Sequence, residues 1–312
     1  MIFIKKTIGI PRALLYYYDK DLWIEFFKKL DFKIIISNKT TKQTIEQGTS
    51  LVPSEACLAL KIYLGHIIEL KDKCDYILVP RIFSLKKNEQ VCTNFNALYD
   101  LTNNLLDINI LNYNVDVSTH NYQLLAFLHL GEQLGISYIK TYQAYKYAEK
   151  IQKMKREKQS LEQHNLLNNN DNLKILLAGH SYNLYDELVG VPIKKFLEEN
   201  NITVIYSDRL TEELVEEEYQ KLSKEIHWTH NKEIVASAKY YEDKVDGIIL
   251  ISSFPCGPDS LMNEQITRKI KNVPIITLIF EDLNNEAGII TRLESFIDIL
   301  KNLKEAELEQ NH

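Results

Sequence analysis

Short apolar runs alternate with amphipathic segments along the first half of the chain. The runs are rich in isoleucine, valine and leucine, as in buried strands, and the segments between them repeat their apolar residues at helical spacing. The predicted strands are residues 7–10, 32–36, 75–80 and 108–115. The predicted helices are residues 21–30, 42–47 and 54–70, with Ser54 as the cap of the last one. This alternation predicts a parallel sheet covered by helices.

The same alternation restarts in the second half of the chain. The predicted strands are residues 174–179, 202–206, 245–251 and 274–280, and the predicted helices are residues 192–199, 212–218 and 290–303. The acidic residues 212–218 are typical of an exposed helix face. The run 274–280 is almost wholly apolar, which favours a central position in its sheet.

The segment between the two halves has a different character. Residues 120–167 are helical in pattern and carry long charged stretches, and residues 165–172 are rich in asparagine, which is typical of a linker. We therefore predict an α/β fold with two domains, residues 1–168 and 169–312, a helical connecting segment and an interdomain cleft. Such clefts are common ligand sites.

Composition narrows the class of protein. The chain has 312 residues, of which 45% are hydrophobic and 26% charged, and its net charge of −6 argues against nucleic-acid binding. Apolar runs are too short to span a bilayer, and the first six residues lack the apolar core of a signal peptide. We expect a cytoplasmic protein with no membrane partner. Four cysteines without a CxxC pair do not resemble a disulfide framework.

The cysteines differ in their surroundings. Cys256 follows the run 245–251 and lies between two prolines and a glycine, on a stiff loop where α/β sheets bind their ligands. Cys57 lies in the first turn of a predicted helix, where a thiolate is favoured, although a buried apolar role fits its position equally well. Cys92 lies in a loop after the third strand, and Cys74 fits a structural role beside that strand.

Three thiols at strand ends of both halves could converge in the cleft. Soft thiolates select zinc, copper(I) or iron–sulfur clusters, and a three-thiolate set leaves one metal position open. His66 follows Cys57 on the same predicted helix, either as an ordinary buried histidine or as a hydrogen-bond donor to a bound cluster. The chain has no phosphate-binding loop, dinucleotide fingerprint, GxSxG or HExxH motif.

Several motifs in order resemble the acyl-CoA dehydratase activase-related family, whose members are relatives of 2-hydroxyacyl-CoA dehydratase subunits. The resemblance extends from about Ile8 to Leu300. The motifs are Ile8-Gly9-Ile10-Pro11-Arg12, Glu55-x-Cys57 with Lys61 and Gly65-His66, Tyr182-Asn183-Leu184-Tyr185-Asp186, Phe254-Pro255-Cys256-Gly257-Pro258-Asp259-Ser260 and Thr291-Arg292-Leu293-Glu294. His180 stands where relatives more often have arginine, which leaves the substrate open.

The resemblance implies Rossmann-like domains that hold a 4Fe–4S or double-cubane iron–sulfur cluster through Cys57, Cys92 and Cys256. It also implies an ATP-hydrolysing activase of the kinase, Hsp70 and actin superfamily as partner, low-potential electron transfer or dehydratase chemistry, and an acyl-CoA or other small substrate. Glu55, Lys61, His66 and Asn183 are candidate cleft residues. The chain is expected to act alone or within a homo- or hetero-oligomer.

Two other functions remain open at this point. The first is a non-catalytic scaffold or regulatory subunit that binds a cluster or only the partner ATPase. Less favoured is a zinc site made by the same thiols with His66.

Overall fold

Parallel strands form the centre of each half of the molecule in the computed structural model, which describes residues 5–168, 172–281 and 286–310. The first half contains β1 (Thr7–Ile10), β2 (Lys33–Ile36), β3 (Tyr76–Ser84) and β4 (Ile110–Asp116). Its helices are α1 (Tyr16–Lys29), α2 (Lys42–Thr49), α3 (Leu58–Leu70), α4 (Thr93–Leu105), α5 (Gln123–Gln133) and α6 (Tyr138–Leu167).

The second half repeats this plan. Its strands are β5 (Lys174–Gly179), β6 (Thr203–Tyr206), β7 (Gly247–Ser253) and β8 (Ile275–Phe280). Its helices are α7 (Ser181–Leu184), α8 (Gly190–Glu199), α9 (Glu212–Leu222), α10 (Thr229–Tyr241), α11 (Gly257–Lys269) and α12 (Glu286–Gln310).

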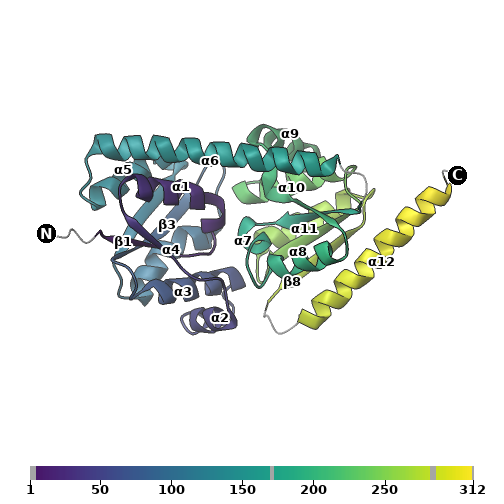
Figure 1. Ribbon diagram of the computed structural model, residues 1–312, viewed down its shortest axis with the longest axis horizontal. Helices are drawn as coiled ribbons and strands as arrows, with labels where there is room; N and C mark the ends of the chain where they lie inside the picture. Colours follow the sequence, from purple (N-terminus) through teal and green to yellow (C-terminus); the bar gives the residue numbers. More distant parts are fainter. Residues whose placement is uncertain (1–4, 169–171, 282–285, 311–312) are drawn as a thin grey trace.

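The two sheets have the same strand order. The first is β2-β1-β3-β4 and the second is β6-β5-β7-β8, and all strand pairs are parallel. The chain leaves the first strand of each sheet on one side and returns to the other side for the third strand. The predicted α/β fold with two parallel sheets is therefore confirmed (Figure 1).

Apolar strand residues fill both faces of the second sheet. Leu176, Ile248 and Leu250 pack with residues of α9, α10 and α11 in one buried cluster. Ile249 and Ile251, which point to the opposite face, pack in another cluster with residues of α8 and α12. Because both faces are covered, the strands are near-continuous apolar runs rather than alternating ones.

The long helix α6 contacts both halves and runs along one side of the molecule (Figure 1). In its middle, Gln152 Nε2 donates to Asp19 Oδ1 of α1 at 3.1 Å. Near its end, buried Gln163 donates to the carbonyl of Tyr206 and accepts from the amide of the same residue, both at 2.8 Å. Helix α6 therefore covers the β6 edge of the second sheet although it precedes that sheet in the chain.

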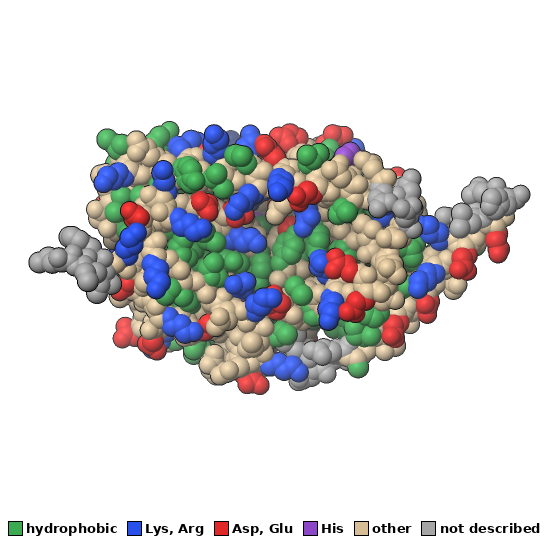
Figure 2. All heavy atoms as spheres, viewed as in Figure 1, with side chains coloured by type: hydrophobic (Ala, Val, Ile, Leu, Met, Phe, Trp, Pro, Cys, Tyr) green, Lys and Arg blue, Asp and Glu red, His purple; other side chains and the backbone are tan. Residues whose placement is uncertain are grey.

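The surface seen in the same view mixes several kinds of side chain. Apolar side chains reach the surface along the junction of the two halves, with Lys and Arg side chains among them (Figure 2). None of the described helices is long and apolar enough to cross a membrane.

Several boundaries differ from the sequence prediction. The helix predicted from Ser54 begins at Leu58, and Cys57 is its N-cap rather than a first-turn residue. Cys92, predicted to lie outside a helix, is the N-cap of α4. The prediction of a central position for residues 274–280 is wrong, because β8 pairs at the edge of its sheet and leaves Ile279 54% exposed. Within the predicted linker 165–172, α6 continues to Leu167, and residues 169–171 lie outside the described part of the chain.

Candidate metal centre

A cavity of about 240 Å³ lies where the carboxyl ends of the inner strands of both sheets meet. Residues that follow all four inner strands line it, among them Leu14 after β1, Val91 after β3, His180 after β5 and Pro255 after β7. In open α/β sheets this edge, at the point where the strand order reverses, is where ligands bind. Here two such edges face one shared space.

Three cysteines line this cavity together: Cys57, Cys92 and Cys256. Each is the N-cap of a helix, α3, α4 and α11 respectively, and none of the three side chains caps its own helix through a hydrogen bond. The sulfur atoms are therefore presented at three helix N-termini. Unpaired amides and the helix dipole make an N-terminus favourable for an anion. The arrangement suits a negatively charged group held by sulfur.

Burial affects the protonation of these thiols. It raises the pKa of Cys256 strongly and that of Cys57 to a smaller degree. The Asp259 carboxylate raises the pKa of Cys256 further, and Cys92 adds a smaller increase to both. Without a cation the two groups are thus neutral thiols and poor nucleophiles. A metal deprotonates a coordinating thiol outright, so this donor set fits a metal group better than a free catalytic thiolate.

The spacing of the sulfur atoms separates one kind of metal group from another. A tetrahedral zinc ion with Zn–S bonds of about 2.3 Å needs sulfur atoms about 3.8 Å apart. Among the described residues, the set of three donors that lie within 4.8 Å of one another is His180, Cys256 and Asp259, and the three cysteines are not such a set. The three cysteines therefore do not have the close spacing that a single tetrahedral zinc ion requires.

Asp259 is held beside Cys256 by a buried polar network. Its Oδ1 accepts from His180 Nε2 and from Asn231 Nδ2, each at 2.8 Å. Tyr18 of α1 lies 3.2 Å from the other ring nitrogen of His180 and accepts from the amide of Ser181. Burial works to raise the pKa of Asp259, but the charge and hydrogen bond of His180, with Asn231, lower it. The network links α1 of the first half to the Cys256 loop.

His230 also lines the cavity, from the first turn of α10. Its side chain is stacked on Tyr18 with ring centroids 4.1 Å apart, and the residue is only 7% exposed. Neither ring nitrogen has a hydrogen-bond partner among the described residues. Burial lowers its pKa to about 3, with smaller effects from His180 and Arg156, so the imidazole is neutral.

The other candidate residues from the sequence lie elsewhere. Glu55 is exposed, and Lys61 donates from Nζ to the Ser54 carbonyl at 2.8 Å. Neither they nor His66 and Asn183 line the cysteine cavity. Cys74 is also outside it, and its thiol donates to the Leu70 carbonyl at 3.2 Å.

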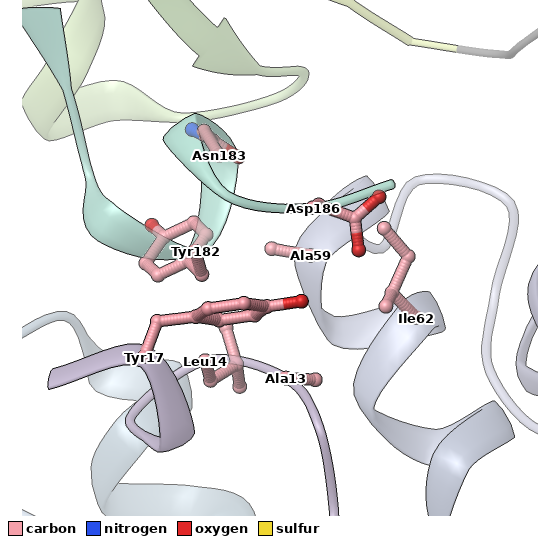
Figure 3. A pocket seen from close by; sticks show the side chains of 8 residues that line it. All are labelled: Ala13, Leu14, Tyr17, Ala59, Ile62, Tyr182, Asn183 and Asp186. Atoms are coloured by element: carbon pink, nitrogen blue, oxygen red, sulfur yellow. The ribbon is translucent and has the colours of Figure 1, made fainter. Parts of the chain in front are cut away.

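Asn183 lines a second, much smaller cavity of about 10 Å³ between the two halves (Figure 3). Its Oδ1 accepts from Ser253 Oγ at 2.7 Å, while its Nδ2 and the nearby Tyr17 hydroxyl have no partner among the described residues. A volume of this size holds about one water molecule. Asn183 thus belongs to the packed junction beside the cysteine cavity.

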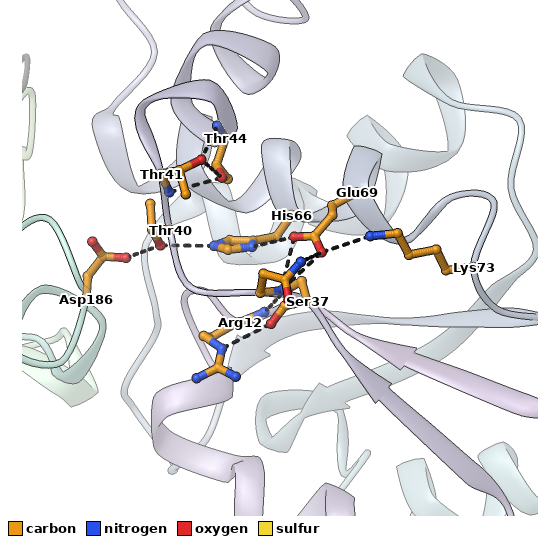
Figure 4. A network of polar contacts seen from close by, with 10 residues as sticks. Arg12, Ser37, Thr40, Thr41, Thr44, His66, Glu69, Lys73 and Asp186 are labelled. Atoms are coloured by element: carbon orange, nitrogen blue, oxygen red, sulfur yellow. Dashed lines mark hydrogen bonds and ion pairs between the residues drawn. The ribbon is translucent and has the colours of Figure 1, made fainter.

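His66 belongs to a network that joins the two halves (Figure 4). Thr40 Oγ1 donates to Asp186 Oδ2 at 2.5 Å and lies 3.1 Å from His66 Nε2, so this nitrogen carries the proton. Burial lowers the pKa of His66 to about 4, and burial raises the pKa of Asp186. Thr40, His66 and Asp186 thus interact with one another, and none of them lines the cysteine cavity.

His230 and the role of Asp259 were not found from the sequence. The stretch around His230 matches no motif, and Asp259 appeared only as a member of the motif at residues 254–260. The one signal that could have indicated His230 is its place at the start of the helix before the third strand of its sheet. The N-cap of the matching helix in the first half is Cys57, whereas the N-cap of α10 is Trp228 and His230 is its second residue.

A protein-family model described as the CoA enzyme activase uncharacterised domain matches residues 7–210. This span is about two thirds of the chain and includes Cys57 and Cys92. The chain belongs to this family. Membership in an activase-related family is therefore confirmed, whereas the closer likeness to dehydratase subunits stays a prediction. Cys256 lies outside the matched residues of the family, and the structure places it in the same cavity as the other two cysteines.

No curated protein matches the chain. Solved structures match at low identity. A crystal structure of ZnuA is 8% identical over 95% of this chain and 99% of that chain, with a TM-score of 0.26. FpvC with Ni²⁺ from Pseudomonas aeruginosa is 9% identical over 97% of this chain and 98% of that chain, with a TM-score of 0.28. The Zn(II)-bound ZnuA-like domain of Streptococcus pneumoniae AdcA is 11% identical over 97% of this chain and 98% of that chain, with a TM-score of 0.27. We draw no conclusion about the fold or the ligand of this chain from TM-scores this low.

Proposed function

We propose that Cys57, Cys92 and Cys256 hold an iron–sulfur cluster, either 4Fe–4S or double-cubane. The protein would work with an ATP-hydrolysing activase in low-potential electron transfer or in reductive or dehydratase chemistry on an acyl-CoA. The observation that carries the proposal is the meeting of three cysteines from two halves at one cavity, each at a helix N-terminus. When bound, the cluster supplies one-electron chemistry at a potential set by the surrounding protein.

The chain's own residues fit such a role. Asn94 Nδ2 donates to Cys57 Sγ at 3.4 Å, and hydrogen bonds to sulfur tune the potential of a cluster. Pro255 and Pro258 restrict the backbone around Cys256. The apolar side chains of Leu60, Val91 and Phe95 are part of the cavity wall.

Anaerobic purification and reconstitution test the proposal directly. We expect a brown protein with several iron and sulfide ions per chain and an electron paramagnetic resonance signal after reduction. Cys256→Ala should lose most of this iron, and the matched control Cys74→Ala should keep it. Colourless, iron-free wild-type protein after reconstitution would sink the proposal.

A second candidate is a non-catalytic subunit that carries the cluster or binds the activase without turning over a substrate. It is favoured by the position of Glu55, Lys61, His66 and Asn183, none of which lines the cavity. An acyl-CoA turnover assay with the purified activase separates the two. Turnover that requires Cys256 supports an enzyme, whereas cluster binding and complex formation without turnover support the accessory role.

A zinc site is the third candidate, and the sulfur spacing is unfavourable for it. Elemental analysis of anaerobic protein decides the question. Zinc bound at one ion per chain, with iron absent, would favour zinc.

A further inference from the structure

Four helices of equal length surround the cavity in matching positions of the two halves. Helices α3 and α10 precede the third strand of their sheets, and α4 and α11 follow it; each has 13 residues. The residues at the starts of all four helices line the cavity. The two halves thus contribute two helix N-termini each.

Two backbone hydrogen bonds confirm that these positions correspond. The amide of Leu58, the first residue of α3, donates to the carbonyl of Phe254 at 3.1 Å. The amide of Thr229, the first residue of α10, donates to the carbonyl of Gln90 at 3.2 Å. Phe254 and Gln90 each lie two residues before a cysteine, Cys256 and Cys92. Each half therefore binds the cysteine loop of the other half through the same contact.

Three of the four helix starts carry a cysteine, and the fourth, α10, carries His230 at its second residue. His230 is 7% exposed, lines the cavity and leaves both ring nitrogens without a partner among the described residues. An unpaired buried imidazole is costly unless a ligand of the cavity satisfies it. The two unpaired ring nitrogens point to an occupant of the cavity that binds one of them.

We propose that His230 is the fourth protein ligand of the cluster, which would make the site Cys₃His with two ligands from each half. The assignment rests on the cluster proposed above. Imidazole nitrogen replaces thiolate as a ligand to iron in other iron–sulfur centres. Neighbouring side chains fit this role less well. Asn231 Nδ2 and His180 Nε2 already donate to Asp259, and the indole nitrogen of Trp228 has no lone pair to offer.

The ligand set bears on the function. In a 4Fe–4S cluster three thiolates alone leave one iron with a place for a substrate oxygen, whereas a fourth protein ligand fills that place. A Cys₃His site is thus an electron carrier, and its chemistry on an acyl-CoA would need a second protein. The inference favours the electron-transfer form of the proposed function over the dehydratase form.

Pulsed electron paramagnetic resonance on the reduced, reconstituted full-length protein tests the assignment. We expect a strong ¹⁴N coupling of a directly bound imidazole, which changes to the ¹⁵N pattern on labelling with ¹⁵N-histidine. His230→Cys should keep the iron and sulfide content and lose the strong coupling, because sulfur replaces nitrogen. His180→Gln, the matched control of a second histidine in the cavity wall, should keep the coupling.

The outcomes distinguish the two proposals. Iron and sulfide present without strong nitrogen coupling overturn the His230 assignment and leave the cluster in place. A coupling that survives in His230→Cys but disappears in His180→Gln also overturns it. Protein without iron and sulfide overturns the cluster, and the His230 assignment falls with it. Circular dichroism of the apo variants checks that each one is folded.

Discussion

The helix before the third strand carries different side chains in the two halves, although its length and its backbone contacts are the same. Helix α3 presents Cys57 to the cavity, whereas α10 presents Trp228 and His230. The loop after the third strand carries a cysteine in both halves, Cys92 in the first and Cys256 in the second. The backbone plan is therefore shared, and only the start of α10 lacks a cysteine.

A similar contrast is found deeper in these helices. The fourth residue of α3 and of α10 is a buried lysine: Lys61 donates to the Ser54 carbonyl, and Lys232 pairs with Glu89 at 2.6 Å. The ninth residue is His66 in α3 and Ser237 in α10, and only His66 reaches a partner that contacts the other half. The comparison teaches that matched backbone positions do not predict matched roles.

The largest expected effect comes from the two equivalent cysteines. Cys92→Ala and Cys256→Ala should lose most of the bound iron to the same extent, because each removes one ligand at the same place in its half. Iron and sulfide counts after anaerobic reconstitution measure this. If only one of the two variants loses iron, the correspondence of the halves at this site is wrong.

The next effect concerns His66, which has no counterpart in α10. Burial holds its pKa at about 4 against an ordinary 6.5, so the unfolded state binds the proton first as the pH falls. The stability that this group contributes is complete above pH 6.5 and is lost towards pH 4, by about 3 kcal/mol in total.

Urea unfolding of the wild type and of His66→Gln between pH 7 and pH 4 measures that loss. We expect the variant to show a shallower fall in unfolding free energy. The difference between the two proteins cancels the contribution of His230, which both share. Exposed His129→Gln is the matched control and should follow the wild type; equal slopes in all three proteins would contradict the prediction.

Gln163 tests the asymmetry that α6 introduces. Its side chain makes three hydrogen bonds at 2.8 Å, two with the backbone of Tyr206 and one with the Tyr241 hydroxyl. Gln163→Leu should lower the unfolding free energy by about 2 kcal/mol, since it leaves buried backbone groups unpaired. Exposed Gln159→Leu on the same helix should change it by less than about 0.5 kcal/mol.

Hydrogen exchange locates the effect. Faster exchange in Gln163→Leu should be concentrated in β6 and not in β2, the matching edge strand of the first half. Uniform acceleration in both strands would mean that α6 does not act locally.

The smallest effect is expected from Asn94, which donates to Cys57 Sγ, while Pro258 takes the matching place after Cys256 and has no such donor. Asn94→Ala should shift the midpoint potential of the reconstituted cluster to a more negative value, because a hydrogen bond to sulfur favours the reduced state. A redox titration monitored by electron paramagnetic resonance measures the shift. Asn104→Ala, on an exposed part of the same helix, should leave the potential unchanged.

Much of the fold could be predicted from the sequence because periodicity reports burial. The apolar runs 174–179 and 245–251 are buried on both faces, and they proved to be the inner strands β5 and β7. The same reasoning was wrong for 274–280, because β8 is an edge strand whose apolar run includes the exposed Ile279. An apolar run therefore does not report the number of neighbouring strands.

The site could be predicted only in part. Cys57, Cys92 and Cys256 were singled out from their local surroundings and the family resemblance, and the structure brings them to one cavity. Their common position as N-caps was missed, because no capping residue marks the helices that they begin. His230 was missed because its meaning depends on the correspondence of α10 with α3, which is visible only when both sheets are folded.

Helix α6 gives the molecule a fixed frame rather than a hinge. Its 30 residues form a rod about 45 Å long that is anchored to α1 at one point and to the β6 edge at another. The two lobes cannot part like a clamshell without breaking one of these anchors. Helix α6 thus resists a change in the distance between the two pairs of helix starts. If the proposed cluster is held between them, its surroundings would move little when its charge changes.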